Sequence, residues 1–138
     1  MAAPRPQPRF PEPDTLPFWE ATKRHELTYQ TCNACNTVIF YPRRHCTSCG
    51  SHETTWRVSK GEGTVYTYTV IMQSRHPAFA ELGAYAVAYV DLDEGFRIMT
   101  NIVMVKDPVK DVQCGMRVRL RWEDQGEGKL SLPMFEPA

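Results

Sequence analysis

The second half of the chain alternates hydrophobic and polar side chains with a period of two residues. The alternation is clearest between residues 64 and 72, where one face carries Tyr66, Tyr68, Val70 and Met72. Because successive side chains of a strand point to opposite faces, this pattern predicts a β-strand. Residues 84–92 are apolar on both faces, which predicts a strand that is buried on both sides.

Glycine-containing turns divide the same half into further strands. Turn signals that combine glycine with an acidic residue stand at 61–63, 93–95 and 126–128. They predict additional strands at 96–105, 116–122 and 129–135. Five strands in about 75 residues, with almost no helix signal, favour a small closed or half-closed barrel of the OB type over a sandwich.

The first residues of the chain are rich in proline. Six of the eleven prolines lie in residues 1–17, and proline lacks an N–H and restricts the residue before it, which predicts an extended arm. A free tail, a strap over a partner and a linker left from a longer polypeptide all fit this arm. Asp14 and Thr15 are helix-capping residue types and Pro17 is tolerated in a first turn, so we expect a short helix from about Leu16 to Glu26.

Four of the five cysteines form two Cys-x-x-Cys pairs, which are Cys32, Cys35, Cys46 and Cys49. Two residues between cysteines let both sulfurs reach one ion from a tight turn, and two such turns supply a tetrahedral set of thiolates. We therefore predict one structural Zn²⁺ ion with no open position for a substrate. The strand-like segment 37–41 between the pairs is typical of a zinc ribbon, and Gly50 relieves the second turn.

Disulfides, an iron–sulfur cluster and a redox dithiol are the alternatives to zinc. The odd cysteine count, together with the lack of an apolar stretch that could be a secretory signal, favours a reducing compartment. We therefore expect a cytoplasmic protein in which disulfides are disfavoured.

A second candidate site is a stripe of arginines, formed by Arg117, Arg119 and Arg121. Period two places their guanidinium groups on one face of a strand, where they can bind a phosphate or a carboxylate group. A solvated face that pairs with Glu127 or Asp124 explains the stripe equally well.

The remaining candidates for chemistry are weaker. Cys114 has no histidine near it in the sequence and is better explained as a small apolar residue. His76 lies in the long connection 73–83 and is better explained as a solvated loop residue. The HExxH, GxSxG, P-loop and GxGxxG motifs are all missing from the sequence, so we predict no catalytic residue.

The net charge of the chain limits the classes of function that it can have. The chain has 16 Lys+Arg and 16 Asp+Glu, a net charge of zero, which argues against a protein whose main task is to grip a phosphate backbone. Residues 1–60 hold 8 basic and 5 acidic residues (+3), whereas residues 61–138 hold 8 basic and 11 acidic residues (−3). The chain also lacks a run of about 18 apolar residues, so we expect no membrane-spanning segment.

Together these patterns predict a mainly β protein in four parts. They are a proline-rich arm at 1–13, an N-terminal helix at 14–29, a zinc ribbon at 30–60 and a five-stranded OB-fold barrel at 61–138.

The order of motifs resembles a known family over about residues 14–137. The matching segments are Phe18-Trp19-Glu20-Ala21, the two cysteine pairs, and the stretches 61–70, 86–95, 115–118 and 132–137. They resemble the zinc-ribbon plus OB-fold accessory proteins catalogued as domain of unknown function thirty-five. Thr47-Ser48 inside the second pair departs from the family, in which proline is frequent there, and should not disturb metal binding.

The resemblance implies a fold and a partner. The fold would be a rubredoxin-like zinc ribbon followed by the OB barrel. The partner would be a thiolase-like enzyme that acts on acyl-CoA thioesters, joined with this chain in a hetero-oligomer. This chain would stabilise the enzyme and help form its CoA channel, and the catalytic residues would belong to the partner.

Among such enzymes, an aldolase that cleaves a β-hydroxyacyl-CoA in steroid side-chain degradation is favoured. The alternative is a complex with acetoacetyl-CoA thiolase and hydroxymethylglutaryl-CoA synthase, or with a MaoC-like hydratase. A single-stranded nucleic-acid module that stacks bases on Tyr66 and Tyr68 is an alternative of another class, disfavoured by the zero charge. A third is a free-standing acyl-CoA carrier or a small enzyme using His76 or Cys114.

Overall fold

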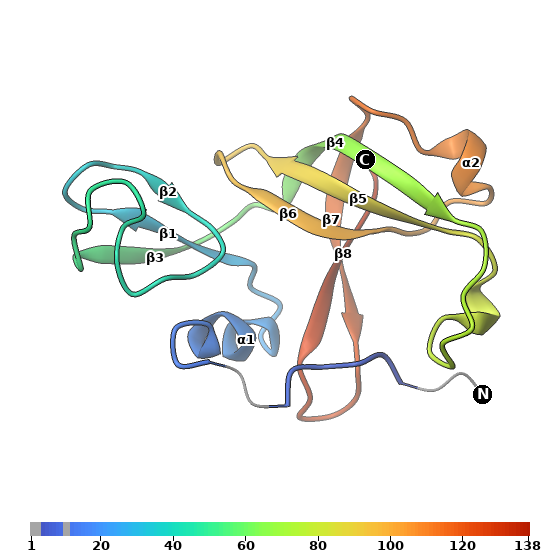
Figure 1. Cartoon of the computed structure of the whole chain (residues 1–138), viewed down its shortest axis with the longest axis horizontal. Coiled ribbons are helices and arrows are strands. Elements are labelled where there is room, and N and C mark those ends of the chain that lie inside the picture. The colour runs from blue at the N-terminus through green and yellow to red at the C-terminus, as the bar shows by residue number, and fades with distance from the viewer. Residues whose placement is uncertain (1–3, 10–11) are drawn as a thin grey trace.

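The computed structural model describes residues 4–9 and 12–138, and it places a three-stranded sheet beside a five-stranded closed barrel (Figure 1). Helix α1 (Leu16–Thr22) precedes the sheet and packs against strands of both units. The mainly β class predicted from the sequence is confirmed. Residues 1–3 and 10–11 of the predicted arm lie outside the described residues, and the boundaries between the four parts stay a prediction.

Helix α1 is shorter than the sequence pattern indicates. We expected it to reach about Glu26, but its C-cap is Lys23, and His25 has a left-handed backbone with φ of 59°. The chain turns here because it must bring Leu27, which is fully buried, into the core. Across the described residues no helix is long and apolar enough to cross a membrane.

The small sheet has β1 (Thr28–Cys32) at its centre. β1 pairs antiparallel with β2 (Val38–Ile39) on one side and with β3 (Thr54–Val58) on the other. The strand expected at 37–41 therefore has only two residues. Tight turns follow the first cysteine of each pair, and Gly50 has a φ of 79°, as its place after the second pair predicts.

The barrel is built from five strands in the order β4-β5-β6-β8-β7. They are β4 (Glu62–Ile71), β5 (Tyr85–Leu92), β6 (Arg97–Ile102), β7 (Arg117–Asp124) and β8 (Ser131–Pro137). Pairing of β4 with β7 closes the cylinder, which confirms the predicted five-stranded OB barrel. Two short helices that the sequence pattern does not reveal, η1 (Ala80–Leu82) and α2 (Pro108–Asp111), lie in the connections.

Among the strand pairs of the barrel, β6 and β8 share the fewest paired residues, and we call their junction the seam. These strands run parallel and share one register pair, Ile102 with Phe135. Two further hydrogen bonds join the seam: the Val103 N–H donates to the carbonyl of Phe135 at 2.7 Å, and the Thr100 hydroxyl donates to the carbonyl of Pro133 at 2.8 Å. Beyond these contacts, β6 and β8 have no other register pair.

Two strands present their side chains differently from our expectation. A bulge between Val65 and Thr67 breaks the alternation of β4, so Tyr66 is 54% exposed while Tyr68 packs against the core. β5 was expected to be buried on both faces, but Tyr89 is 42% exposed. Only one face of β5 points into the barrel, because the sheet closes on itself. On the outside Phe79 stacks on Tyr85, whereas Tyr89 is left exposed.

Aromatic side chains join the small sheet to the barrel. Tyr29 of β1 stacks on Phe96, which precedes β6, with ring centroids 4.9 Å apart. Phe40, which follows β2, lies 4.8 Å from Phe96 and 5.8 Å from Phe18 of α1. The helix, the sheet and the barrel therefore share one hydrophobic core.

Gly63 provides a test of the packing between β4 and β5. A Cβ at Gly63 would stand 2.6 Å from the carbonyl oxygen of Asp91. We expect Gly63→Ala to lower the free energy of unfolding by about 1–3 kcal/mol, because the added methyl group forces the strands apart. Gly128→Ala is the control in urea denaturation: with nothing within 4 Å and a φ of 70°, it carries only the left-handed backbone penalty. A smaller loss at Gly63 than at Gly128 would contradict the close approach.

Candidate functional site

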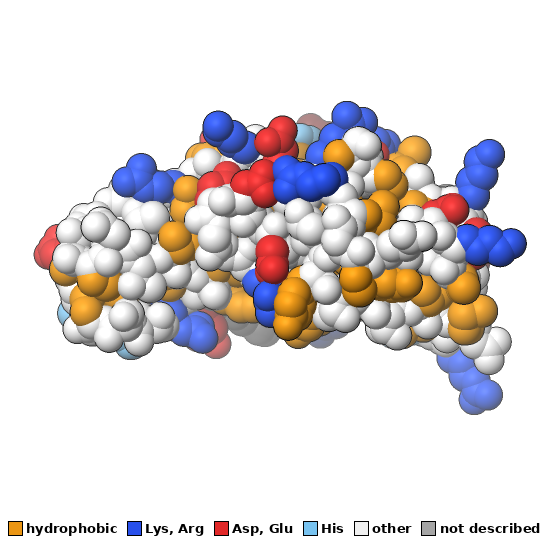
Figure 2. Space-filling model, turned by 90° about the horizontal axis from the view of Figure 1, so that it is seen from above, with side chains coloured by type: hydrophobic (Ala, Val, Ile, Leu, Met, Phe, Trp, Pro, Cys, Tyr) orange, Lys and Arg blue, Asp and Glu red, His pale blue; other side chains and the backbone are white. Residues whose placement is uncertain are grey.

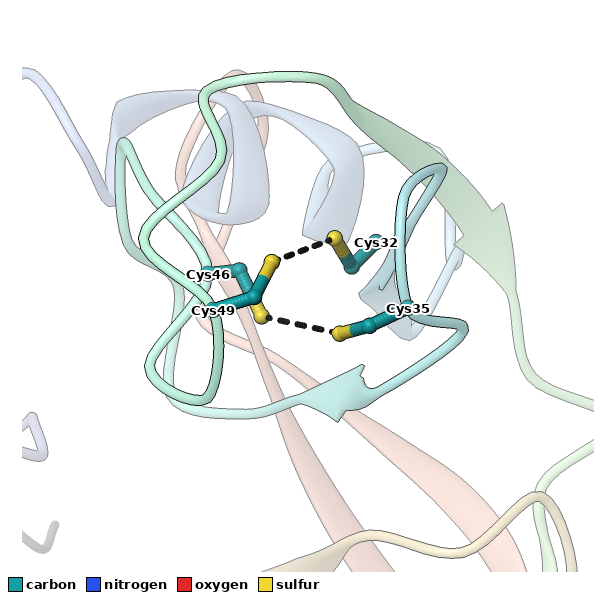
Figure 3. A group of neighbouring side chains, drawn as sticks. All are labelled: Cys32, Cys35, Cys46 and Cys49. Carbon is teal, nitrogen blue, oxygen red and sulfur yellow. Dashed lines mark hydrogen bonds between the residues drawn. The ribbon is translucent and has the colours of Figure 1, made fainter.

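The four cysteines of the two pairs converge at one end of the small sheet (Figure 3). Cys32 ends β1, Cys35 follows in the turn, and Cys46 and Cys49 lie in the connection between β2 and β3. All four sulfur atoms lie within 4.8 Å of one another, and the Cys32–Cys49 and Cys35–Cys46 sulfur distances are both 3.6 Å. Zinc–sulfur bonds of about 2.3 Å in a tetrahedron separate the sulfurs by roughly 3.8 Å, so the cluster fits one zinc ion.

The pKa values of two of these thiols shift in opposite directions. Hydrogen bonds from the backbone of Cys49 and Ser48 lower the pKa of the Cys46 thiol to about 6. The backbone of Ser51 lowers the pKa of the Cys49 thiol, but the sulfurs of Cys32 and Cys35 outweigh it and raise that pKa to about 11. Four thiolates this close together repel one another, so they coexist only around a positive ion.

The cysteine cluster agrees with a structural role for this ion. Cys32 and Cys46 are buried, Cys35 and Cys49 are exposed, and all are free thiols. The disulfides that the sequence left open are therefore not observed. Four thiolates fill a tetrahedral shell, so a zinc ion held here has no position left for substrate or water.

The arginine stripe lies on the outer face of β7, as its spacing predicts. Arg117 forms a double ion pair with Asp93, with distances of 2.8 and 2.7 Å. Arg119 and Arg121 share Glu136, at 2.9 and 3.2 Å. These carboxylates differ from the two near the turn that the sequence suggested. Three guanidinium groups face two carboxylates, which leaves an excess of one positive charge, and the role of the stripe in binding stays a prediction.

A second polar cluster, which the sequence pattern did not reveal, ties the end of α1 to β7 and β8. Asp124 accepts hydrogen bonds from His25 Nε2 at 2.5 Å and from the Ser131 hydroxyl at 2.7 Å. The His25 ring also stacks on Trp122, with centroids 5.4 Å apart. The members are far apart in the sequence, so no local motif could have indicated the contact.

The two weaker candidates for chemistry are His76 and Cys114. His76 Nδ1 accepts a hydrogen bond from the backbone N–H of Ala78 at 3.1 Å, which shapes its own loop. Cys114 is an exposed thiol between α2 and β7. In the parts of the chain that the structure describes, no side-chain hydrogen bond joins either residue to an acid or a base.

Two family models match adjoining parts of the chain. Residues 19–55 match the rubredoxin-like zinc ribbon domain of ChsH2, and residues 56–123 match the C-terminal OB-fold domain of ChsH2. The cysteine cluster and the ribbon match together agree with one structural zinc ion.

Curated relatives carry two kinds of name. A DUF35 domain-containing scaffold protein of Methanocaldococcus jannaschii is 36% identical over 103 residues, which cover 72% of this chain and 70% of that protein. A probable enoyl-CoA hydratase alpha subunit of Thermomonospora curvata is 41% identical over 122 residues. That alignment covers 88% of this chain but only 37% of the relative, so this chain spans little more than a third of its length.

Solved structures include two similar chains. One belongs to the Ltp2-ChsH2(DUF35) aldolase, with a TM-score of 0.83 and 37% identity over 95% of this chain and 98% of that chain. The other is a DUF35 family protein from Sulfolobus solfataricus, with a TM-score of 0.64 and 13% identity over 91% and 86% of the two chains. The second similarity shows a shared fold.

Removal of the metal should unfold the small sheet before the barrel. Its separate buried cluster consists of Cys32, Ile39 and Cys46, so two of its three members are predicted ligands. We expect a chelator to abolish hydrogen-exchange protection around residues 30–52 first. Cys114→Ser, which removes the thiol outside the cluster, should leave metal content and protection unchanged. Unaltered protection after the metal has been removed would rule out a structural ion.

Glu136 should make the stability depend on acidity. A hydrogen bond from Arg119 holds the pKa of this carboxyl below its ordinary value of 4.5. Its contribution is therefore present above the unfolded-state pKa and is lost as the pH falls through the lower folded-state pKa. We expect Glu136→Gln to lower the melting temperature at pH 6, and the difference from the wild type to shrink as the pH drops below about 4. Glu127→Gln, at an exposed turn, should show no such dependence, and an equal effect at both positions would contradict the assignment.

Proposed function

This chain belongs to the DUF35 family of zinc-ribbon and OB-fold proteins, and from that membership we propose that it is an accessory subunit of a thiolase-like enzyme that acts on acyl-CoA thioesters. The observation that carries the proposal is the similarity to the chain of the Ltp2-ChsH2(DUF35) aldolase, which covers helix, ribbon and barrel together. A ribbon or a barrel alone occurs with many functions, whereas their combination along one chain is far more restrictive.

In this proposal Cys32, Cys35, Cys46 and Cys49 are the ligands of one structural zinc ion. When bound, the ion supplies folding energy to a sheet that has little core of its own. It takes no part in the reaction, because four thiolates leave it no open position.

The chemistry would take place in the partner. The nearest approach to a catalytic set among the described residues is the cluster of Ser131, Asp124 and His25. There the carboxylate lies between the hydroxyl and the imidazole, and the Ser131 hydroxyl donates to Asp124, so the imidazole is not placed to activate it. This arrangement supports an enabling role for the chain rather than a catalytic one.

The reaction that we propose for the partner is cleavage of a carbon–carbon bond in a β-hydroxyacyl-CoA, as in the degradation of a steroid side chain. This chain would order the partner's loops and help form the channel for CoA. Arg117, Arg119 and Arg121 would contact a CoA phosphate or a partner carboxylate, in exchange for their bonds to Asp93 and Glu136.

A second candidate partner is a MaoC-like hydratase. It is favoured by the similarity to the Thermomonospora curvata protein named as a probable enoyl-CoA hydratase alpha subunit. A nucleic-acid role has less support, because carboxylates neutralise most of the arginine stripe and the net charge is zero.

Co-expression with the thiolase-like enzymes of the source organism tests the proposal. We expect one of them to co-elute with this chain and to cleave its β-hydroxyacyl-CoA substrate faster with the chain than without it, because an accessory subunit completes the CoA channel. The measurements are size-exclusion chromatography with light scattering and the rate of thioester product release. Full enzyme activity without the chain, or no complex with any of them, would refute it. A complex with a MaoC-like hydratase alone would support the second candidate instead.

A further inference from the structure

Beyond the row of Thr64, Asp91 and Arg97, the outer wall of the barrel is uncharged across three neighbouring strands. The strand registers place eight outward residues in adjoining rows on β4, β5 and β6: Thr67, Tyr89 and Met99; Thr69, Val87 and Asn101; Ile71 and Tyr85. None of them is charged. The solvent face of an antiparallel sheet ordinarily carries polar and charged side chains, so this wall differs from a face built for water.

Three hollows lie on or beside this wall, and Met99, which is 57% exposed, lines all three. The first, of about 270 Å³, lies at the seam where β6 and β8 diverge and is bordered by α1 and by Phe40 and Tyr41. The second, of about 350 Å³, lies over β4 and β5 beside Tyr89. The third, of about 240 Å³, lies beside Phe79. Met99 is thus the ridge between three adjoining depressions.

The backbone at Met99 is held in place. Its N–H donates to the Tyr41 hydroxyl at 3.3 Å, so the connection after β2 closes one side of the first hollow. The depressions are therefore framed by paired strands and by a hydrogen-bonded aromatic side chain.

Charges border this wall without entering it. Arg97 at one end is neutralised by Asp91, with distances of 2.6 and 3.1 Å, and its guanidinium lies 3.5 Å from the centre of the Tyr66 ring. The arginine stripe of β7 lies on a different part of the barrel. Seen from above, the barrel half of the molecule carries a band of hydrophobic side chains, with most charges along its edges (Figure 2).

The charge and shape of the wall indicate which kind of molecule binds to it. Phosphate groups find no unneutralised cation among the eight outward residues, which disfavours an anionic ligand. Two copies of a hollowed wall placed face to face would leave voids, because depressions need protrusions to fill them. A neutral protein surface with protruding aliphatic and aromatic side chains matches both the charge and the shape of the wall. Tyrosine and methionine, which line the wall, are also residue types that are enriched in the cores of interfaces.

We infer that the outer wall of β4, β5 and β6 is the surface on which the acyl-CoA enzyme docks, with apolar side chains of that enzyme inserted into the hollows around Met99. The inference rests on the proposed function, and it adds which face of this chain the enzyme covers and by what chemistry. The contact on this wall is hydrophobic, so its contribution to the affinity should depend little on salt.

A lysine at Met99 tests the docking wall. Met99→Lys puts an unpaired charge at the centre of the contact, so we expect the dissociation constant for the enzyme that the wild-type chain binds to rise by at least about a hundredfold. Met104→Lys is the matched control: Met104 is 67% exposed and lines none of the three hollows, so its effect should stay within about twofold. The binding is measured by calorimetry with the purified enzyme, and metal content and melting temperature establish that each variant is folded.

Further measurements separate the possible outcomes. Thr67→Lys, at an exposed position of the same wall, repeats the test if Met99→Lys lowers the melting temperature. Equal binding of the wild-type chain and the folded wall variants would overturn the docking wall and leave the proposed function standing. A wild-type chain that binds no acyl-CoA enzyme would overturn both. A chain that sediments alone as a dimer, and as a monomer after Met99→Lys, would assign the wall to a second copy and overturn the inference.

Discussion

The contact of Tyr29 and Phe40 with Phe96 is the interaction on which the arrangement of the whole chain depends. The small sheet alone buries only two cysteines and an isoleucine as a separate cluster, too little to hold three strands in place. By stacking on Phe96, its aromatic residues join the core of the barrel, and Phe18 brings the helix into the same core. Each aromatic pair adds about 0.5–1.5 kcal/mol beyond its buried area, which makes the junction stiff as well as apolar. The first hollow next to Met99 is bordered by the same Phe18 and Phe40, so docking and folding share side chains.

Features that depend on local spacing were predictable from the sequence. The two cysteine pairs indicated the cluster because their chemistry needs only a short separation along the chain. The strands of the barrel followed from period two and from glycine turns. The end of α1 and the bulge after Val65 could not be predicted, because both depend on what the chain packs against afterwards.

The uncharged wall shows how a real hydrophobic pattern in the sequence can lead to a wrong prediction of burial. The apolar outward residues of β5 indicated burial, and the inference was reasonable for a strand with two apolar faces. In the single chain one of those faces is partly exposed. The ion pairs of the arginine stripe were missed for a different reason. Asp93 lies 24 residues from Arg117, and Glu136 lies 17 and 15 residues from Arg119 and Arg121. Both errors concern which surfaces contact each other in the folded chain. The pattern of residues along the sequence does not contain that information.

The topology also imposes an order of assembly on a chain that emerges from the ribosome N-terminus first. The strands of the small sheet pair only with one another and are complete by Val58. The barrel closes only when β8, at residues 131–137, reaches β6 and β7. Between those moments Tyr29 and Phe40 lack their contact with Phe96, although Phe18, which packs on Phe40, has already been made. An ion held by the four cysteines would keep the three early strands paired with each other until the later strands arrive.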